Sequence, residues 1–378
     1  MKKILIIGGG EMQIPVIQKC NEMGFQTIVT DGFNFAPGLK IANIPLNIDT
    51  LDKVKTLEIA EEFKIDAIIT TSDFPVNNVA FVANKLGLPG LSPLAAEVST
   101  NKYLQREILK KNHYKTPSFI KTKKLNEVKD ELLKFNLPLI VKPVDSSASR
   151  GVTKIINFFD LENAFNEAVK VSKSGDIIIE EFIEGKEYSV ESLTQNGITY
   201  VIAITEKYII DDPNYFVEER HIIPAELNIE QREIIVNYVT EIISLFDINN
   251  SGTHTEIKLS NNECTLIELG ARLGGDFIAS DLVPLSTGVD MLKNIILIAM
   301  NQNIEINNVN SKYSGIQFIH KNNYMSALKF SEIENFVVRK EIKNFNNAAI
   351  KSSMDRLGYF IIQDSSRENL LKKLNFEL

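Results

Sequence analysis

Two glutamates in neighbouring predicted strands give this sequence its clearest chemical signal. Glu256 lies in the segment Thr253 to Lys258 and Glu268 in the segment Ile267 to Gly275, with a polar turn between them. In an antiparallel hairpin, the loop length decides which residues face each other. A three-residue loop, 261 to 263, places Glu256 directly opposite Glu268, whereas a two-residue loop sends the two side chains to opposite faces. We expect the facing pair, and the hairpin register tests it.

Facing carboxylates of this kind indicate a cation site. Two carboxylates opposite each other repel, so the arrangement costs stability unless a cation lies between them. Ligation by oxygen alone suits Mg²⁺ that is bound together with substrate phosphates. Arg272 follows Glu268 by four residues, where it can stabilise charge that develops on a phosphoryl or acyl centre. We therefore predict that Glu256 and Glu268 bind a metal ion and that Arg272 is catalytic.

A lysine and a small-residue segment predict phosphate binding. Lys142 ends the apolar strand Leu139 to Pro143, and the Ser/Ala/Gly-rich segment Asp145 to Gly151 follows at once. Such a lysine is either an edge residue or a phosphate ligand, and such a segment alone is more often a flexible linker. Small side chains let backbone N–H groups approach phosphate oxygens closely. Because the two features are adjacent, we favour phosphate binding.

A cluster of acids follows a buried strand. The eight residues from Glu180 to Glu187 contain four glutamates, directly after the apolar run Ile177 to Ile179. A solvated acidic turn is the simplest reading, but acids at the end of a buried strand need a reason. Glu187, Ser189 and Glu191 alternate with apolar residues, so they share one polar face of the next strand.

Two histidines lie near these acids. His221 follows Glu218 by three residues in the segment Tyr208 to Pro224, which we expect to be loop-bearing and near a site. His221 is either part of that site or a surface loop residue. His254 precedes Glu256 by two and shares its face, so it either supports the metal ligands or is a strand residue packed beside them.

The N-terminal glycines do not form a dinucleotide fingerprint. Gly8, Gly9 and Gly10 follow the first predicted strand, but the fingerprint requires a further glycine at position 13, where Gln13 stands. Asp31 ends the second strand, where a ribose-binding acid would lie, and this signal alone is weak. A tight strand-to-helix turn is the favoured reading, and a small-molecule pocket at the strand ends is compatible with it.

These residues need a framework of alternating strands and helices. Strands at Lys3 to Ile7, Gln26 to Thr30 and Ala67 to Thr71 alternate with helices at Glu11 to Met23 and Asp52 to Phe63, which predicts an open parallel sheet. Further segments follow along the chain, with helices at Asn101 to Asn112, Asp160 to Val171 and Glu230 to Phe246, and strands at Ile177 to Glu181, Lys186 to Leu193, Tyr313 to Ile319 and Tyr359 to Ile362. The region after about residue 301 is richer in Asn and Lys, and we expect a small closing subdomain there.

The composition is that of an ordinary globular protein. The 378 residues are 44% hydrophobic and 24% charged, with a net charge of −8, which argues against a nucleic-acid partner. Cys20 and Cys264 are far apart, so a disulfide framework is not expected. No signal peptide or membrane span is evident, and we expect a soluble cytoplasmic protein with a homodimer as the default assembly.

The features in this order resemble the ATP-grasp superfamily. The resemblance runs from residue 1 to about 300 and depends on Asn101-Lys102, Lys142, the small-residue loop, Glu180 to Ile183, Glu187, and Glu256 with Glu268. It implies an α/β protein with three parts. Residues 1–98 form a Rossmann-like open parallel sheet, 99–300 an ATP-grasp domain of two α+β subdomains that clamp ATP, and 301–378 a small C-terminal closing subdomain.

The resemblance assigns roles to single residues. Lys102 and Lys142 contact the nucleotide phosphates, and Ser146, Ser147, Ser149 and Gly151 belong to the loop that closes over them. Glu180 accepts a hydrogen bond from the adenine amino group, the segment Glu181, Phe182 and Ile183 meets the ring edge through its backbone, and Glu187 holds the ribose hydroxyls. Glu256 and Glu268 carry Mg²⁺, with Mn²⁺ as an alternative ion, and Arg272 stabilises the acyl-phosphate.

Within the superfamily, the chain resembles carboxylate–amine ligases that include bacterial L-amino-acid (dipeptide) ligases. The residues that suggest this branch are Tyr215 to Glu218, His221, His254 to Glu256, and Glu268 through Asp276. Glu218 and His221 then line an amino-acid pocket and count as catalytic-site residues. Ser72, Asp73, Gly274, Gly275 and Asp276 are the expected substrate contacts.

The activity implied is ATP-dependent amide or peptide bond formation. A small-molecule carboxylate is activated as an acyl-phosphate, an amine attacks it, and ADP and phosphate are released, with an amino acid as one substrate. The alternatives are an amino sugar, ammonia or another small amine as acceptor, or a bicarbonate-type carboxyl as in biotin-carboxylase-like and purine-biosynthesis enzymes. A nucleotide-binding protein without catalysis is less favoured, because a binder has no need of Arg272.

One position departs from the superfamily pattern. Many members have Glu-x-Asn-x-Arg at the second metal site, whereas this chain has Gly270 in place of the asparagine. Gly270 offers no side-chain oxygen, so metal ligation depends on the two glutamates and water. The number of Mg²⁺ ions, one or two, stays open at this point.

Overall fold

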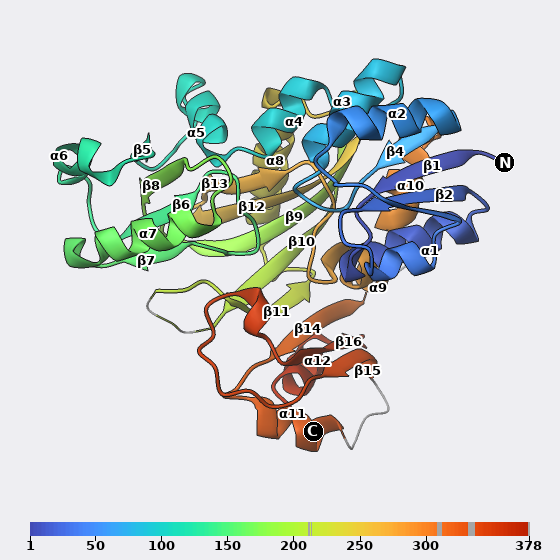
Figure 1. The fold of residues 1–378 in the computed structure, drawn as a ribbon. Coiled ribbons are helices and arrows are strands. Elements are labelled where there is room, and N and C mark those ends of the chain that lie inside the picture. Colours follow the sequence, from blue (N-terminus) through green and yellow to red (C-terminus); the bar gives the residue numbers. More distant parts are fainter. Residues whose placement is uncertain (211, 213, 308–311, 332–336, 377–378) are drawn as a thin grey trace.

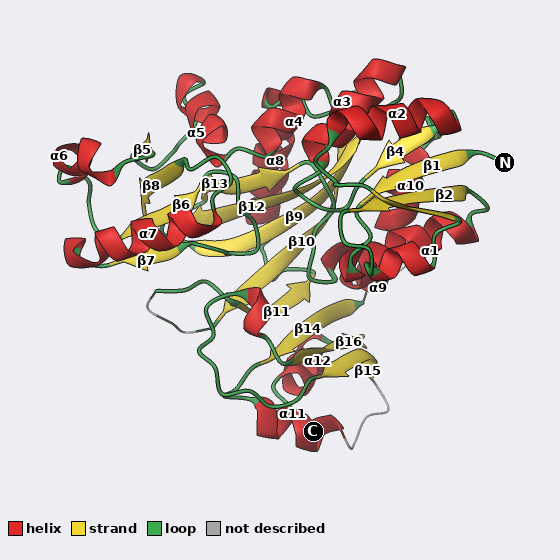
Figure 2. Cartoon of the chain, viewed as in Figure 1, coloured by secondary structure: helices red, strands yellow, loops and turns green. Residues whose placement is uncertain are grey.

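The chain folds into an α/β molecule that is built on three sheets (Figures 1 and 2). The computed structural model describes residues 1–378 except 211, 213, 308–311, 332–336 and 377–378. In Figure 1 the N-terminal region lies at the upper right, a small sheet with α7 at the left, and the C-terminal region below the long central strands.

The N-terminal region is an open parallel sheet, as the sequence predicts. Its strand order is β3-β2-β1-β4. In β1, Ile4 and Ile6 pack towards α1, while Leu5 and Ile7 pack towards α2 and α3, so both faces of the strand are covered. The elements are β1 Lys3–Ile7, α1 Ile14–Glu22, β2 Gln26–Asp31, β3 Ile44–Asn47, α2 Lys53–Phe63, β4 Ala67–Ile69, α3 Val76–Leu86 and α4 Pro93–Ser99.

The second sheet has four antiparallel strands in the order β5-β8-β6-β7. Helix α7 covers one face, because Leu139 and Val141 of β6 share a core with the apolar stripe of that helix. Side chains alternate along a strand, so Ile140 and Lys142 point to the other face. The elements are α5 Lys102–Lys111, β5 Phe119–Thr122, α6 Lys129–Leu132, β6 Leu139–Pro143, β7 Thr153–Ile155, α7 Leu161–Val171 and β8 Ile177–Glu181.

The third sheet has eight strands in the order β13-β12-β9-β10-β11-β14-β16-β15. Helix α8 packs on one face of β9, β12 and β13. The strand order shows that the C-terminal strands β14, β16 and β15 extend this sheet instead of forming a separate one. The elements are β9 Lys186–Gln195, β10 Ile198–Ile209, β11 Glu218–Ile223, α8 Ile229–Leu245, β12 Ser251–Ser260, β13 Glu263–Gly270, α9 Val283–Thr287, α10 Met291–Ala299, β14 Tyr313–Ile319, α11 Tyr324–Ser331, β15 Val337–Ile342, β16 Gly358–Asp364 and α12 Arg367–Leu374.

Helix α10 joins the N-terminal sheet to the eight-stranded sheet. Its Ile295 and Ile296 share one core with Ile4 of β1 and with Leu193 and Ala203 of the long strands. Among the described residues, no single helix has the length and apolar composition to cross a membrane, and only the bent pair Ile278–Thr287 and Met291–Ala299 meets that test together. Cys20 and Cys264 are buried and free, as expected.

In the segment expected to bear a loop, the described residues 210, 212 and 214–217 lie outside strands, and residues 211 and 213 lie outside the described part of the chain. β10 extends to Ile209 and β11 begins at Glu218, and the two pair as an antiparallel ladder, with Lys207 opposite His221. The prediction of a loop-bearing Tyr208 to Pro224 is therefore confirmed between the two strands, but it did not anticipate strand β11. The charged residues and the proline masked a strand whose polar side chains have partners inside the molecule.

The hairpin that carries the two glutamates has the expected facing pair but not the expected loop. Ser260 pairs with Glu263, so the loop has two residues, and both of them, Asn261 and Asn262, have left-handed φ values of 51° and 59°. This loop alone would send the glutamates to opposite faces. A register shift after Glu256 makes Glu268 its partner, because Ile257 pairs with Leu266 and leaves one extra residue in β13.

The extra residue is Ile267, and it forms a β-bulge. The facing pair of Glu256 and Glu268 is thus confirmed, whereas the three-residue loop was wrong. A bulge re-aims side chains and is common next to functional sites. Two asparagines provide the tight turn, since Asn tolerates positive φ better than other non-glycine residues.

Candidate active site

A cavity of about 640 Å³ lies between the four-stranded and the eight-stranded sheets. Its walls come from β6 and β8 on one side and from β9, β10, β12 and β13 on the other. The carboxyl ends of β1 and β4 contribute Gly10 to Gln13 and Thr71 to Asp73 at one end. Ser353 and Met354 of the C-terminal region reach the same cavity.

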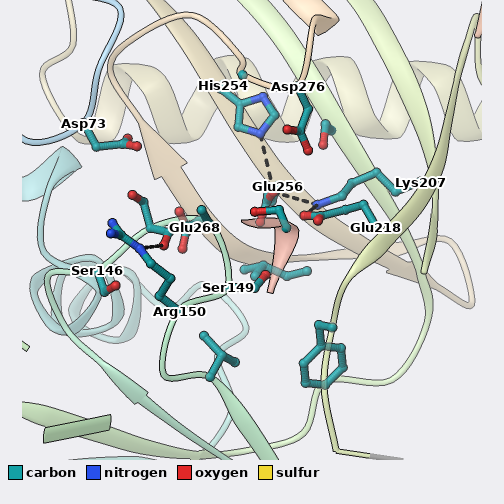
Figure 3. Close-up of a pocket in the computed structure, with 18 of the residues that line it drawn as sticks. Asp73, Ser146, Ser149, Arg150, Lys207, Glu218, His254, Glu256, Glu268 and Asp276 are labelled. Carbon is teal, nitrogen blue, oxygen red and sulfur yellow. Dashed lines mark hydrogen bonds and ion pairs between the residues drawn. The ribbon is translucent and has the colours of Figure 1, made fainter. Parts of the chain in front are cut away.

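The facing glutamates lie in this cavity, and Figure 3 shows Lys207 beside Glu256. Lys207 Nζ donates to Glu256 Oε1 at 2.7 Å, and Lys102 Nζ lies 2.8 Å from Glu268 Oε2. Burial opposes the ionisation of Glu256, but Lys207 and His254 outweigh it and hold the pKa of Glu256 well below its ordinary value. Both carboxylates therefore meet cations, which is what facing acids require.

The donor set fits a magnesium ion that shares its coordination with a nucleotide. Within the described part of the chain, no three His, Cys, Asp or Glu side chains come together as a self-sufficient metal site. Mg²⁺ is commonly held by one or two carboxylates together with phosphate oxygens and water. Glu256 and Glu268 suit that mode, and Gly270 adds no oxygen, as the sequence indicates.

His254 lies between Glu256 and the buried Glu191 and contacts both carboxylates. Its Nδ1 lies 2.5 Å from Glu191 Oε1 and its Nε2 lies 3.4 Å from Glu256 Oε1. Burial lowers the pKa of His254, but the Glu191 carboxylate raises it more strongly, to about 9. The imidazolium thus bridges two carboxylates. His254 therefore links Glu256 of β12 to the buried Glu191 of β9.

Glu191 also fixes the loop after β13. The Gly274 N–H donates to Glu191 Oε2 at 3.1 Å, and a Cβ at Gly274 would lie 2.7 Å from both carboxylate oxygens. Only glycine fits there without a shift of the buried acid. Gly274 is not among the cavity-lining residues, whereas Gly275 and Asp276 are. The expected substrate contact at Gly274 is therefore replaced by a packing role.

The predicted phosphate lysine is held by an acid and an unpredicted arginine. Lys142 Nζ lies 2.5 Å from Glu180 Oε1, and Arg106 donates to the same carboxylate from Nε at 2.9 Å and from Nη2 at 3.2 Å. All three are buried. Burial opposes the ionisation of Glu180, but the two cations lower its pKa to about 2. Glu180 lines the cavity with Arg106 and Lys142 as its nearest partners.

Arg106 was not predicted from the sequence. It lies in a charged helix, where it shares the buried face with Lys102, Gln105 and Leu109, and the spacing of these four residues was a signal that the sequence reasoning did not use. Its Nη2 also donates to the Ile267 carbonyl at the bulge, at 2.9 Å. Arg106 thereby connects the acid of β8 to the hairpin of the metal glutamates.

The small-residue loop lines the cavity from Ser146 to Arg150. Lys102 Nζ donates to the Ser146 carbonyl at 2.6 Å, and Ala148 and Ser149 have left-handed φ values of 58° and 55°. Gly151 does not line the cavity. A Cβ there would lie 2.4 Å from Val171 of α7, so Gly151 allows the loop to pack on that helix, and its expected contact with phosphates is corrected to this role.

The opposite end of the cavity offers a flat apolar slot. The rings of Phe182 and Phe216 are stacked with centroids 6.2 Å apart, and Lys258 Nζ lies 3.9 Å from the Phe182 centroid while it donates to the Ile183 carbonyl. Glu187 pairs with Lys207 at 2.8 Å. The Glu181 side chain is bonded to Ser118 and Asn136 instead and does not line the cavity.

Arg272 is fixed by an acid of the N-terminal region. Its Nε and Nη2 donate to the two oxygens of Asp73 at 2.7 and 3.1 Å. Burial opposes the ionisation of Asp73, but Arg272 lowers its pKa below the ordinary value. Ser72 lines the cavity beside them. The structure thus joins the expected catalytic arginine to an expected substrate contact.

A second arginine, Arg356, holds two further acids at this end. Its Nη2 lies 2.6 Å from Glu218 Oε2 and its Nη1 lies 2.8 Å from Asp276 Oδ2, while its guanidinium lies 3.6 Å from the Phe318 ring centroid. It comes from the C-terminal region, 80 residues beyond Asp276 in the chain. A short-range sequence pattern could not predict that Arg356 contacts Glu218 and Asp276, because they are far apart in the chain.

His221 is buried and is not a surface loop residue. Its side chain is 1% exposed in β11, and its Nε2 lies 3.7 Å from Asp276 Oδ2. Its Nδ1 has no hydrogen-bond partner within the described residues. Glu218, His221 and Asp276 all line the cavity, so the structure brings these predicted residues together.

Comparison with known families and proteins identifies the fold. Residues 135–281 match the ATP-grasp domain family. The chain is 32% identical over 246 residues to alanine–anticapsin ligase of Bacillus subtilis (strain 168), which covers 58% of this chain and 51% of that protein. It is 26% identical over 284 residues to formate-dependent phosphoribosylglycinamide formyltransferase of Sulfurisphaera tokodaii. That match covers 72% of this chain and 70% of that protein. The chain thus spans about half the length of the alanine–anticapsin ligase.

Solved structures share the whole arrangement. An L-amino acid ligase from Bacillus licheniformis superposes with a TM-score of 0.83 at 24% identity and covers 100% of this chain and 98% of that one. N5-carboxyaminoimidazole synthetase from Staphylococcus aureus, complexed with ADP, superposes with a TM-score of 0.78 at 18% identity. This superposition covers 100% of this chain and 97% of that one. These likenesses establish the ATP-grasp fold.

Proposed function

Because the chain carries an ATP-grasp domain, we propose that it is an ATP-dependent ligase that joins a small carboxylate to an amine. The observation that carries the proposal is the facing pair of Glu256 and Glu268 in a cavity that continues to Arg272. Carboxylates for a metal, lysines beside a small-residue loop, and an arginine at the far end are the groups that phosphoryl transfer to an acid requires.

The nucleotide is proposed to lie along the two sheets. Its base enters the slot at Phe182 and Ile183, Glu187 accepts from the ribose, and Lys102, Lys142 and the Ser146 to Ser149 loop contact the phosphates. When bound at Glu256 and Glu268, Mg²⁺ neutralises phosphate charge and orients the terminal phosphoryl group. The same two carboxylates pair with Lys102 and Lys207, whose ammonium groups lie at this end of the cavity.

The reaction is proposed to run in two steps. A substrate carboxylate oxygen attacks the γ-phosphorus, the bond to the β-phosphate oxygen breaks, and ADP leaves. An amine then attacks the acyl carbon, and phosphate leaves with the bonding pair. Arg272 stabilises the negative charge that collects on oxygen in both steps, and Asp73 keeps its guanidinium fork in one orientation.

The substrate end favours an amino acid. Glu218 and Asp276 present two carboxylates to this part of the cavity, and carboxylates accept hydrogen bonds from an ammonium group. The similarity to alanine–anticapsin ligase and to an L-amino acid ligase supports the same substrate class.

Phosphate release tests the proposal. The protein is incubated with ATP and Mg²⁺, and with single amino acids, pairs of amino acids, formate, bicarbonate, ammonia or amino sugars. We expect release that requires an amino acid and rises with a second amine, with an amide product seen by mass spectrometry. Release that depends on bicarbonate or formate but not on any amino acid would contradict the amino-acid assignment.

A further inference from the structure

Phe74 of the N-terminal region contacts two cations that belong to the four-stranded sheet and its connections. Lys173 Nζ lies 3.4 Å from the centroid of its ring, and Arg150 Cζ lies 5.3 Å from the same centroid. Phe74 is half-buried and lies in the connection between β4 and α3. An aromatic ring attracts cations that lie over its face. None of the roles described above involves this ring.

The two cations are both attached to the small-residue loop. Arg150 lines the cavity at the end of that loop, and its Nε donates to the Ser147 carbonyl at 3.1 Å. Lys173 follows α7, and its backbone N–H donates at 3.2 Å to Oδ1 of Asp145, the residue that precedes the loop. The aromatic ring is therefore connected to both ends of the loop, directly through Arg150 and by way of Asp145 through Lys173.

The residue before Phe74 contacts the opposite wall of the cavity. Asp73 accepts two hydrogen bonds from Arg272, which follows β13 of the eight-stranded sheet. Phe74 contacts the connections of the four-stranded sheet, which forms the other wall. Two successive residues of the N-terminal region thus fix groups on both walls, one by an ion pair and one by an aromatic ring.

We propose that Phe74 is a positioning residue that holds the small-residue loop in place for the nucleotide, through its contacts with Arg150 and Lys173. The inference rests on the proposed function, in which this loop contacts the phosphates. A partner that stabilises the binding-competent arrangement of a loop increases its population and so raises the apparent affinity for the ligand. The segment that orients Arg272 thereby also adjusts the affinity for the nucleotide.

A packing role for the ring makes a different prediction. Leucine keeps much of the apolar volume of phenylalanine but has no π face, whereas tyrosine keeps the π face. If the ring only fills space, Phe74→Leu leaves the loop as it is. If the ring holds the two cations, Phe74→Leu loosens the loop and Phe74→Tyr does not.

Limited digestion of the full chain with trypsin tests the contact without any turnover. Mass spectrometry measures cleavage after Arg150 relative to cleavage after Lys343, an exposed residue beyond β15 that also reports general unfolding. Cleavage follows the population of the opened loop when opening is fast. We expect the ratio to rise about tenfold in Phe74→Leu, which corresponds to about 1.4 kcal/mol for the two cation–π contacts, and to stay unchanged in Phe74→Tyr. An unchanged ratio in Phe74→Leu overturns the proposal.

Phe81 provides a matched control in the same region of the chain. Its ring also has two cations near its face, with Lys53 Nζ at 5.8 Å and Lys85 Nζ at 5.9 Å from the centroid. Phe81 lies on α3 and does not line the cavity. Phe81→Leu should therefore leave the cleavage ratio unchanged. A rise equal to that in Phe74→Leu would show that the loss of either ring loosens the loop, and would overturn the assignment to Phe74.

Binding of ADP with Mg²⁺, measured by calorimetry, tests the consequence for the nucleotide. We expect the affinity to fall about three- to tenfold in Phe74→Leu and to be retained in Phe74→Tyr. A raised cleavage ratio with unchanged ADP affinity contradicts the positioning role. A wild type that binds no ADP contradicts the proposed function, whereas the digestion still shows whether Phe74 holds the loop.

Turnover separates the two successive residues. With an amino acid that supports phosphate release, Phe74→Leu should raise the KM for ATP about three- to tenfold and change kcat by less than about twofold, because the ring acts on nucleotide binding. Asp73→Asn should instead lower kcat, because the carboxylate acts through Arg272. A fall in kcat with an unchanged KM in Phe74→Leu would contradict the role of the ring in holding the loop.

Discussion

The metal end and the substrate end of the cavity hold their acids with different cations. At the metal end, Glu256 pairs with Lys207 and Glu268 with Lys102. An ammonium group is a compact charge on a flexible stem, and it can exchange partners with little rearrangement. In the proposed function, these carboxylates would bind a metal ion, and flexible lysines are suitable partners for such acids.

At the substrate end the partners are arginines. Arg272 engages both oxygens of Asp73, and Arg356 bridges Glu218 and Asp276. A guanidinium group is planar, stays charged and binds carboxylates in a fixed orientation. The difference teaches that one end of the cavity is built to exchange ions, whereas the other is built to keep a shape.

Removal of a proposed metal glutamate should have the largest effect, because only one of the two facing carboxylates then remains. We expect Glu268→Ala to lower ATP turnover by more than about 10³-fold, beyond the usual range for one electrostatic donor. The variant should stay folded, since Glu268 is not part of a core. Phosphate release and thermal unfolding measure the two outcomes.

Glu263→Ala is the matched control, because Glu263 lies on the same strand but pairs with Lys115 at the surface. It should leave turnover unchanged. Near-normal turnover in Glu268→Ala would sink the metal assignment.

Exchange of an arginine for a lysine tests whether the substrate end depends on geometry. Arg272→Lys keeps the charge but loses the two-pronged contact with Asp73, so we expect a fall in kcat of about 10²–10³-fold. Asp73→Asn should have a smaller effect in the same direction, because the arginine keeps its charge and loses only its orientation. If Arg272→Lys retains full kcat, charge alone is sufficient and the contrast between the two ends fails.

Arg356 is expected to contribute mainly to stability. Arg356→Met removes the guanidinium group that Glu218 and Asp276 share, which should lower the free energy of unfolding by about 3 kcal/mol, the lower part of the range for a broken buried pair. Denaturant unfolding measures this value. Adding Asp276→Asn should recover part of the loss, and no recovery in the double variant would contradict the ion-pair explanation.

The smallest expected effect is on stability and concerns Glu180, the acid that pairs with Lys142. It depends on pH. The folded-state pKa of Glu180 is about 2, below its ordinary value of 4.5, so its stabilisation is present above pH 4.5 and is lost as the pH falls towards 2. Glu180→Gln should therefore be less stable than the wild type at pH 7, and the gap should narrow in acid. A gap that is constant from pH 7 to pH 3 would contradict the assigned pKa.

The metal end could be predicted from the sequence because strand periodicity is local. Lys142, Glu180, Glu187 and Glu256 each lie on a strand whose alternation decides which face they share, and the predicted strands were found. The hairpin shows the limit of this reasoning. Its loop length was wrong, and the facing pair depends on a bulge at Ile267 that no residue type announces.

The substrate end could not be predicted in the same way because it is assembled from remote segments. Asp73 and Arg272 are 199 residues apart, and Arg356 and Glu218 are 138 apart. Lys207 was missed because β10 itself was not predicted, and His221 was left open because its strand was read as a loop. Such contacts depend on how sheets pack, which local patterns do not encode.

Transfer of oxygen-18 from the substrate tests the central claim most directly. An amino acid labelled in its carboxylate is supplied with ATP, Mg²⁺ and an amine acceptor, and the released phosphate is analysed by mass spectrometry. Attack of the carboxylate on the γ-phosphorus predicts one labelled oxygen in each phosphate that accompanies an amide product. Phosphate released with an amide product but without the label would contradict the acyl-phosphate route and the function assigned to this cavity.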